Sequence, residues 1–347
     1  MRRISVRDVG SYDVCIERGL LSALGEAVRD VTDGRRAAVV TDPAVAERWG
    51  QAALSSLEAA GIEGVLLPIP GGEKCKCPET YLSLLARLAD QGLCREDAVI
   101  ALGGGVTGDL AGFAAATYLR GVPYLSVPTT LLAMVDSSVG GKCGIDLPEG
   151  KNLCGTFYAP RAVLIDPDLL STLPAGEMSN GWAEVVKYAL LAAPELADAD
   201  TADEDLIARC LSLKADLVAR DPRDTGDRRL LNLGHTFGHA MEKLSGYALP
   251  HGRAVAAGMA LMCRACTRMG ICGGEVYPLL RDALLRHGLS VECPYEAKDL
   301  AEAARGDKKR AGDLITPVVI RSFGQCALNT MRVEKLFDYA LLGAEEL

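Results

Sequence analysis

Asp97-Ala-Val-Ile-Ala-Leu-Gly-Gly-Gly-Val-Thr-Gly-Asp109 joins an apolar run to three consecutive glycines. The apolar run, residues 97–102, has the length and composition of a buried strand, and the residues after the glycines continue as a helix. Because glycine has no side chain, the backbone amides of residues 103–105 can approach a pyrophosphate at the N-terminus of that helix. The stretch does not match the GxGxxG fingerprint, and a turn that serves only packing is the alternative interpretation. It therefore indicates an α/β fold with a nucleotide site at this turn.

The same order of strand and helix repeats on both sides of this stretch, from about residue 35 to residue 170. Buried strands are predicted at residues 36–41, 64–69, 97–102, 122–127 and 161–166, with helices over residues 44–60 and 79–91 and after the glycines. Strands that alternate with helices are typical of a mainly parallel sheet covered on both faces. Asp42 follows the first strand and is placed to accept a hydrogen bond from a ribose hydroxyl. Thr129 and Thr130 open a later helix and can add hydroxyl contacts.

The composition restricts the class of protein. A chain of 347 residues is long enough for two domains and a large core. No apolar run reaches the length of a membrane span, and the N-terminus lacks the apolar stretch of a signal peptide. Twelve cysteines without an export signal point to free thiols in a reducing compartment, and Cys263 and Cys266 are interpreted as packing residues. We therefore expect a soluble cytoplasmic protein, and the net charge of −9 argues against nucleic acid as a partner.

Three of the four histidines lie close together in the second half of the chain, at positions 235, 239 and 251. His235 and His239 are four residues apart, so they share one face of a helix. His251 would lie about 24 Å from His235 if that helix continued, because each residue adds about 1.5 Å. The two can meet only if the chain turns back, and Gly246 and Pro250 provide a break between them.

A third metal ligand is expected from residues 183–188, an apolar helix with Glu184 in its middle. Two histidines and one carboxylate form the ligand set of a catalytic zinc, whose fourth position stays open to water or substrate. Glu184, His235 and His251 are therefore the candidate ligands of Zn²⁺ or Co²⁺. The alternative interpretation is that the histidines are hydrogen-bonded core residues. The segment lacks the Glu of HExxH, so it is not a metalloprotease signature.

Lysine and arginine residues gather near glycines in spite of the negative net charge. Gly140-Gly-Lys142 and Gly150-Lys-Asn152 follow Arg120, and cations beside glycines suit a phosphate or carboxylate in a tight pocket. Further cationic and polar candidates are Lys187, on the same helix face as Glu184, and then Lys214, Arg228, Asn232, Lys308 and Lys309. The pattern predicts a small anionic substrate.

Five longer motifs occur along the chain. They are Gly103-Gly-Gly-Val-Thr-Gly-Asp-Leu-Ala-Gly-Phe113, Pro128-Thr-Thr-Leu-Leu-Ala-Met-Val-Asp-Ser-Ser-Val-Gly-Gly-Lys142, Gly150-Lys-Asn152, Ala183-Glu-Val-Val-Lys187 and Leu231-Asn-Leu-Gly-His-Thr-Phe-Gly-His239. Because these motifs occur in the order and spacing of the 3-dehydroquinate synthase family, the chain resembles that family from about Asp42 to Lys309. The resemblance implies a Rossmann-like, parallel-sheet, NAD-binding α/β domain over residues 1–172 and an all-α metal- and substrate-binding domain over residues 173–347. It also implies a divalent metal in the cleft between the domains, and a homodimer.

The family's reaction converts 3-deoxy-D-arabino-heptulosonate 7-phosphate, a phosphorylated sugar with a carboxylate, into 3-dehydroquinate and phosphate. Bound NAD⁺ oxidises the hydroxyl at carbon 5, and the new ketone acidifies the proton at carbon 6. Phosphate then leaves by elimination, the ketone is reduced back, the ring opens, and an aldol closure forms the carbocycle. The resemblance implies that the metal binds the hydroxyls at carbons 4 and 5 and lowers the pKa of the one that is oxidised.

The resemblance also implies roles for the remaining candidates. The residues expected to contact NAD are Asp42, Glu73, Lys76, Gly103, Gly104, Gly105, Asp109, Thr129, Thr130 and Lys151, together with Asp136 and Lys142. Those expected at the phosphate and carboxylate ends of the substrate are Lys142, Asn152, Arg120 and Lys308 or Lys309. Those expected around the sugar, with catalytic roles, are Asp136, Lys187, Lys214, Arg228, Asn232 and His239. His239 lies one turn beyond a metal ligand and is a natural proton shuttle.

The chain departs from the family's pattern at several positions. Arg253 stands two residues after a ligand, where the family usually has Glu, and it either lies on the outer face of its helix or touches the groups around the metal. Met134 replaces the usual Gln and Cys143 the usual Thr or Ala, and neither change removes a group needed for the chemistry. Residues 221–224 interrupt the usual acidic run before Arg228.

Three other functions remain open. The first is another sugar phosphate cyclase, which would keep the metal and NAD motifs; among these, an aminodehydroquinate synthase would also keep the same substrate contacts. A metal-dependent polyol dehydrogenase of the glycerol dehydrogenase type would have little use for so many cations. A catalytically inactive NAD-binding protein is disfavoured because no expected catalytic position is lost.

Overall fold

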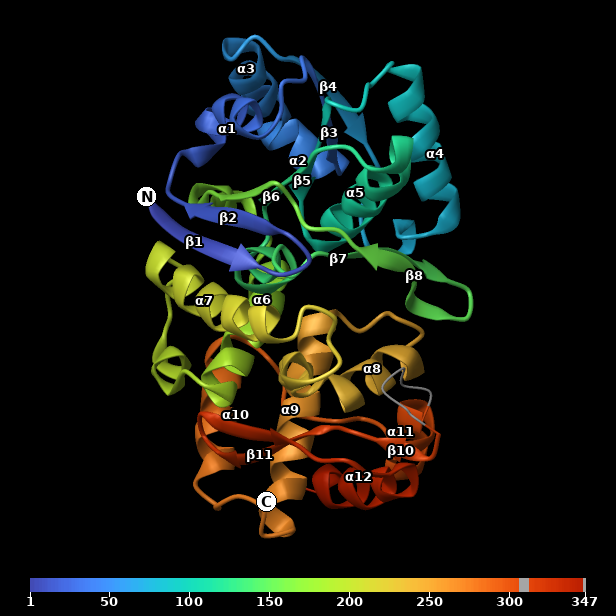
Figure 1. Ribbon diagram of the computed structural model, residues 1–347. Coiled ribbons are helices and arrows are strands. Elements are labelled where there is room, and N and C mark those ends of the chain that lie inside the picture. The colour runs from blue at the N-terminus through green and yellow to red at the C-terminus, as the bar shows by residue number, and fades with distance from the viewer. Residues whose placement is uncertain (306–311, 346–347) are drawn as a thin grey trace. The chain divides into compact units, whose positions relative to one another are not determined.

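The computed structural model describes residues 1–305 and 312–345, which form two compact units (Figure 1). Unit 1 comprises Met1–Pro174 and Ala202–Arg223, and unit 2 comprises Ala175–Thr201 and Asp224–Leu347. The chain first passes from unit 1 to unit 2 between Pro174 and Ala175. The chain then returns to unit 1 through α7 (Glu204–Arg220), whose apolar face packs beside the N-terminal strand. The amphipathic pattern of α7 is typical of a helix with one buried face, but it carries no information about which unit covers that face.

Unit 1 is built around a seven-stranded sheet in the order β1-β2-β9-β6-β5-β3-β4. All five predicted strands are present in it and pair in parallel, as expected. They are β3 (Arg36–Thr41), β4 (Glu63–Pro68), β5 (Ala98–Gly103), β6 (Tyr124–Pro128) and β9 (Ala162–Ile165). Every residue of β5 is buried, which explains its uninterrupted apolar sequence.

An antiparallel hairpin that was not predicted extends the sheet at one edge. β1 (Arg2–Arg7) pairs with β2 (Ser11–Ile16), and β2 pairs in parallel with β9. Alternate residues of β2 are buried, as in a strand with one covered face. This alternation lies before the segment in which strands and helices alternate, so the α/β pattern alone does not include it.

Helices cover the sheet of unit 1. α4 (Pro78–Asp90) and α5 (Gly105–Thr117) share one buried apolar cluster with β3, β5 and β6. α1 (Leu24–Val31) and α3 (Gln51–Ala59) pack against each other, away from α4 and α5 (Figure 1). Short α2 (Pro43–Val45) follows β3. This arrangement brings the carboxyl end of β5 and the N-terminus of α5 together at the glycine turn, as in other doubly covered sheets.

A second unpredicted hairpin carries the two glycine–lysine motifs. β7 (Lys142–Leu147) pairs antiparallel with β8 (Gly150–Phe157), so Lys142 and Asn152 lie on two adjacent strands. Gly140 and Gly141 precede β7 with φ angles of 100° and 64°, which residues with a side chain rarely adopt. The glycines therefore form turns, as predicted, but the segments between them are strands.

Unit 2 is mainly helical. Its helices are α6 (Ala175–Leu191), α8 (His235–Leu244), α9 (His251–Arg268), α10 (Val276–Arg286), α11 (Ala297–Arg305) and α12 (Leu336–Ala344). Two short antiparallel pairs accompany them, β10 (Leu314–Ile315) with β13 (Met331–Arg332) and β11 (Val318–Ser322) with β12 (Gln325–Leu328). The expectation of a helical domain is met, but the domain is not all-α.

Two predictions made from composition can be compared with the structure. All twelve cysteines are free thiols, and Cys263 and Cys266 are fully buried on α9, in keeping with a packing role. Across residues 1–305 and 312–345, the helices are too short or too polar to cross a membrane.

Candidate functional site

Glu184 lies in the middle of α6 and is almost completely buried, with 1% of its side chain exposed. Lys187 lies three residues later on the same helix face, and its Nζ is 2.5 Å from Glu184 Oε2. A charge so deeply buried is stable only when opposite charge is close to it. One carboxylate oxygen of Glu184 thus faces Lys187, and the other, Oε1, faces the histidines of unit 2.

His235 begins α8, directly after Gly234, whose backbone is left-handed with φ 77°. The Nδ1 atom of His235 is 2.9 Å from the carbonyl oxygen of Leu233 and can donate to it. Because Nδ1 faces the Leu233 carbonyl, Nε2 is the ring nitrogen that faces Glu184, and it lies 3.8 Å from Glu184 Oε1.

The chain turns back between α8 and α9, as predicted. Gly246 and Tyr247 both have positive φ angles, 61° and 62°, and the Tyr247 amide donates to the Glu242 carbonyl at 2.7 Å. Pro250 then precedes α9, which begins at His251. His251 Nε2 ends 3.5 Å from Glu184 Oε1, although 67 positions separate the two residues in the sequence.

Glycines allow the helices of unit 2 to approach each other closely. A Cβ atom on Gly258 of α9 would lie 2.1 Å from the Gly234 carbonyl oxygen. A Cβ atom on Gly252 would lie 2.1 Å from the Asn180 carbonyl oxygen of α6. The Gly252 amide also donates to the Asn180 side chain. Glu184, His235 and His251 converge because α6, α8 and α9 pack backbone against backbone.

We expect Gly258→Ala to separate α8 from α9 and to lower stability by about 1–3 kcal/mol, the usual cost of overpacking a core. Because His235 opens α8 and His251 opens α9, metal affinity should fall along with stability. The measurements are the denaturant midpoint and zinc affinity by chelator competition. Gly274→Ala is the matched control, since a Cβ there meets no atom within 4 Å. Unchanged stability and affinity in Gly258→Ala would contradict the packing argument.

The three candidate ligands fit a metal ion. One ligand atom from each of Glu184, His235 and His251 lies within 4.8 Å of the other two. Zinc–ligand distances of about 2.1 Å put neighbouring tetrahedral ligand atoms about 3.4 Å apart, close to the 3.5 and 3.8 Å found here. Burial alone would lower the pKa of His251, but the nearby carboxylates of Glu184 and Glu242 raise it to about 9. The site therefore attracts a cation.

Other predicted residues of unit 2 lie on the same elements. The His239 ring is 5.3 Å from that of His235 and 6.0 Å from that of His251, between centroids. Arg228 is buried in the short helix Asp227–Asn232, and Asn232 ends that helix. Arg253 is exposed, which supports the interpretation that it lies on the outer face of α9. Lys308 and Lys309 lie outside the described residues.

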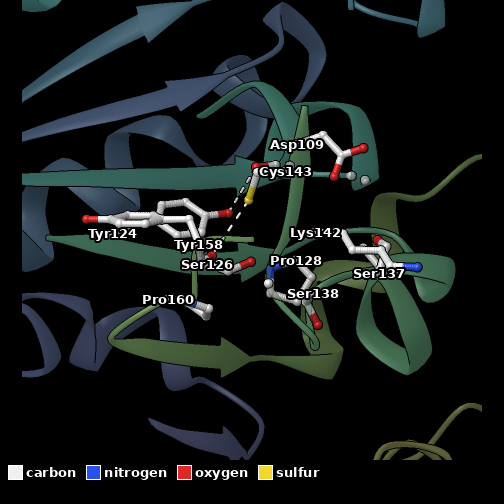
Figure 2. Close-up of a pocket in the computed structure, with 16 residues that line it drawn as sticks. Asp109, Tyr124, Ser126, Pro128, Ser137, Ser138, Lys142, Cys143, Tyr158 and Pro160 are labelled. Atoms are coloured by element: carbon white, nitrogen blue, oxygen red, sulfur yellow. Dashed lines mark hydrogen bonds between the residues drawn. The ribbon is translucent and has the colours of Figure 1, made fainter. Parts of the chain in front are cut away.

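In unit 1 a small pocket lies at the N-terminus of α5. Gly103, Gly104, Gly105, Asp109, Ser137, Ser138 and Lys142 are among the residues that line it. Figure 2 shows the rings of Tyr124 and Tyr158 toward one end of the pocket and Lys142 toward the other. The hydroxyls of Ser137 and Ser138 are buried and have no hydrogen-bond partner within the described part of the chain. Such hydroxyls suit a polar ligand, because an unsatisfied buried donor costs free energy.

Lys76 connects two of the predicted site residues. Its ammonium group lies 2.5 Å from Asp109 Oδ2 and also bonds the side-chain oxygen of Asn152. Burial alone would lower the pKa of Lys76, but the charges of Asp109 and Glu73 raise it. Lys76 is therefore charged and holds the NAD candidate Asp109 and the substrate candidate Asn152 together.

Several of the remaining candidates of unit 1 bond other groups of the protein. Lys151 and Glu73 form an ion pair at 3.5 Å, and Lys214 of α7 bonds the Asp136 carbonyl at 2.6 Å and also its carboxylate. The side chain of Asp42 caps α2 through the amides of Ala44 and Val45, a role that was not predicted. Thr129 is buried, Thr130 accepts from the Ala133 amide, and Arg120 is exposed with φ 68°.

Sequence reasoning missed four residues that the structure places at these sites. Glu242 lies 3.6 Å from His251 Nδ1, and Asn180 holds the first turn of α9. Ser137 and Ser138 supply the buried hydroxyls of the pocket. Helical spacing could have identified Glu242, which is seven residues after His235 and three after His239, on the same face. No local signal distinguishes Asn180.

Comparisons with known proteins concern the family and the fold of the chain. A family model described as 3-dehydroquinate synthase N-terminal matches residues 66–180, and one described as 3-dehydroquinate synthase C-terminal matches residues 181–310. The chain is 45% identical to a 3-dehydroquinate synthase of Pelobacter propionicus, over 94% of this chain and 95% of the relative. It is 44% identical to that of Caulobacter vibrioides, over 90% of each.

Solved structures show the same fold. A 2-epi-5-epi-valiolone synthase from Streptomyces hygroscopicus subsp. jinggangensis 5008, with NAD⁺ and Zn²⁺ bound, is similar with a TM-score of 0.88 and 28% identity over 99% of each chain. A glycerol dehydrogenase from Schizosaccharomyces pombe is similar with a TM-score of 0.65 and 15% identity, covering 95% of this chain and 88% of that one. The second likeness concerns the fold alone.

Proposed function

The chain belongs to the 3-dehydroquinate synthase family, and we propose that it converts 3-deoxy-D-arabino-heptulosonate 7-phosphate into 3-dehydroquinate and phosphate with NAD and a divalent metal. The observation that carries the proposal is the convergence of Glu184, His235 and His251 in unit 2. Relatives at 45% and 44% identity over nearly their whole length bear the same family name. The valiolone synthase, at 28% identity, was solved with NAD⁺ and Zn²⁺, which supports the same cofactors here.

In unit 2 we propose that Glu184, His235 and His251 hold Zn²⁺ or Co²⁺. When bound, this metal supplies a Lewis acid that lowers the pKa of a substrate hydroxyl. Lys187 neutralises one oxygen of Glu184 and leaves the other directed toward the histidines. His239, exposed one turn beyond His235, is proposed to move a proton to or from the sugar. Arg228 and Asn232 are proposed to bind the sugar's polar groups.

In unit 1 we propose that the pocket at α5 holds part of NAD. A bound NAD⁺ would supply the reversible oxidation of a substrate hydroxyl. Gly104 and Gly105 line this pocket at the start of α5, and we propose that a phosphate group approaches their backbone amides. Both glycines also pack closely, because a Cβ on either would lie about 3 Å from the side chain of Thr130 or Ser137. The unpartnered hydroxyls of Ser137 and Ser138 offer donors, and Lys142 offers a positive charge. Lys76, Asp109, Glu73, Lys151, Asp42, Thr129 and Thr130 remain proposed NAD contacts.

The substrate's two anionic ends account for the cations of unit 1. Lys142 and Asn152 lie on adjacent strands of one hairpin, but Lys142 pairs with Phe157, five residues along β8 from Asn152. We therefore propose that the two side chains contact different groups of the substrate. Lys214 holds Asp136 through its carbonyl and its carboxylate, which keeps that side chain in one orientation. Arg120 is proposed as a further contact. A homodimer and the contribution of Lys308 or Lys309 stay predictions.

The proposal is tested by supplying the heptulosonate phosphate together with NAD⁺ and Zn²⁺. We expect phosphate and 3-dehydroquinate to appear in equal amounts, because phosphate is the leaving group in the same turnover that closes the ring. Phosphate is measured with molybdate, and the carbocycle by mass spectrometry. Sedoheptulose 7-phosphate, which lacks the carboxylate, is the matched control and should react far more slowly. Equal turnover of both sugars would instead favour another cyclase activity.

A further inference from the structure

His251 is held at both of its ring nitrogens. Nε2 faces Glu184 Oε1 at 3.5 Å, and Nδ1 faces Glu242 Oε1 at 3.6 Å. A neutral histidine that binds a metal through Nε2 keeps its proton on Nδ1, and that proton needs an acceptor. For His235 the acceptor is the Leu233 carbonyl. For His251 the atom in this position is a carboxylate oxygen.

We propose that Glu242 is the positioning residue of the metal site: its carboxylate accepts a hydrogen bond from His251 Nδ1 and thereby directs Nε2 toward the metal. The proposal rests on the proposed metal role of Glu184, His235 and His251. A separation of 3.6 Å is just beyond a hydrogen bond, and a small rotation of either side chain closes it. The negative charge of Glu242 also makes the imidazole a stronger donor to the metal.

The backbone of Glu242 supports the same role. Its carbonyl oxygen accepts from the Tyr247 amide at 2.7 Å and from the Ser245 hydroxyl at 2.8 Å. These bonds fold the return segment that leads to His251. Glu242 therefore fixes the ligand twice, through the path of the chain and through the imidazole ring.

Burial of Glu242 is consistent with a metal nearby. Its side chain is 2% exposed, and an ionised carboxylate in such a position is costly unless positive charge compensates it. A divalent ion bound to His251 would add to that compensation through the imidazole N–H. Carboxylate, histidine and metal form a chain in which each member stabilises the next.

An alternative interpretation is that Glu242 and His251 are ligands of a second cation. His239, Glu242 and His251 also offer ligand atoms within 4.8 Å of one another. With Nε2 committed to the first metal, Nδ1 could bind a second one only after losing its proton. An imidazole that has lost both protons is far less accessible than a neutral one with a carboxylate acceptor. The geometry therefore favours a hydrogen bond over a second metal.

The test compares Glu242→Gln and Glu242→Leu with the parent protein. Gln keeps an acceptor without the charge, and Leu removes both. We expect zinc affinity, measured by chelator competition, to fall about 10-fold for Gln and about 100-fold for Leu, the range found when such outer partners are replaced. The visible spectrum of bound Co²⁺ should shift in both variants. Glu302→Gln, which removes an exposed carboxylate of the same unit, is the control and should bind as the parent does.

Each other outcome has a definite meaning. Parent-like zinc affinity and Co²⁺ spectra in both variants overturn the proposal. A second zinc equivalent that the parent binds and both variants lose makes Glu242 a ligand, which also overturns it. Lower stability of the metal-free variants with an unchanged Co²⁺ spectrum assigns Glu242 to the fold alone. If the parent binds no zinc at all, it is the proposed metal function that fails, and Glu184→Ala would then behave like the parent.

Discussion

Glu184→Ala is expected to abolish metal binding and to lower kcat by at least about a thousandfold, since Lewis-acid stabilisation is worth several kcal/mol and each 1.36 kcal/mol is tenfold in rate. Glu184 Oε1 is the atom that both histidines face, at 3.8 and 3.5 Å. Metal content after dialysis and kcat with saturating substrate are the measurements. Glu302→Ala is the control for loss of an exposed carboxylate from the same unit.

The same substitution should also destabilise the metal-free protein. Lys187 and Glu184 are each 1% exposed, and removing one partner of a buried ion pair costs about 3–5 kcal/mol. The double variant Glu184→Gln/Lys187→Met should recover much of that stability without recovering metal. Equimolar, tightly held zinc in Glu184→Ala would show that another residue is the ligand.

NAD⁺ supplied far below the substrate concentration should support many turnovers with no lasting rise in NADH absorbance. In a cyclase the hydride leaves carbon 5 and returns to it within one turnover, so the cofactor is regenerated in place. A polyol dehydrogenase, whose fold is similar, would consume one NAD⁺ per product. The measurements are absorbance at the NADH band, phosphate released and carbocycle formed, all from one reaction.

Glycerol is the control substrate for this experiment. It has hydroxyls that a dehydrogenase could oxidise, but it has neither the phosphate nor the carboxylate for which Lys142 and its neighbours provide charge. We expect no NADH from it. Steady NADH formation in step with loss of the heptulosonate phosphate, without phosphate release, would replace the cyclase by a dehydrogenase.

The local sequence pattern was sufficient to predict the parallel sheet. It was also sufficient to place each candidate metal ligand on a helix. β5 is a continuous apolar run because it is buried on both faces, and the glycines after it mark the end of the strand. The four-residue spacing of His235 and His239 places them on one face through helical periodicity alone. Gly246 and Pro250 mark the turn through local effects on the backbone. Glycine permits a positive φ angle, and proline fixes its φ angle and ends a helix.

Only tertiary contacts decided that Glu242 lies beside His251 and that α7 belongs to unit 1. The side chain of Glu242 reaches His251 across a loop whose path depends on hydrogen bonds and positive φ angles. α7 belongs to unit 1 although it follows the first helix of unit 2, because its apolar face packs beside β1. Periodicity records that a face is buried and does not record which partner covers it. The identity of the metal's candidate ligands could thus be predicted from local pattern and family resemblance, whereas the residue that orients His251 emerged only from contacts between segments distant in the chain.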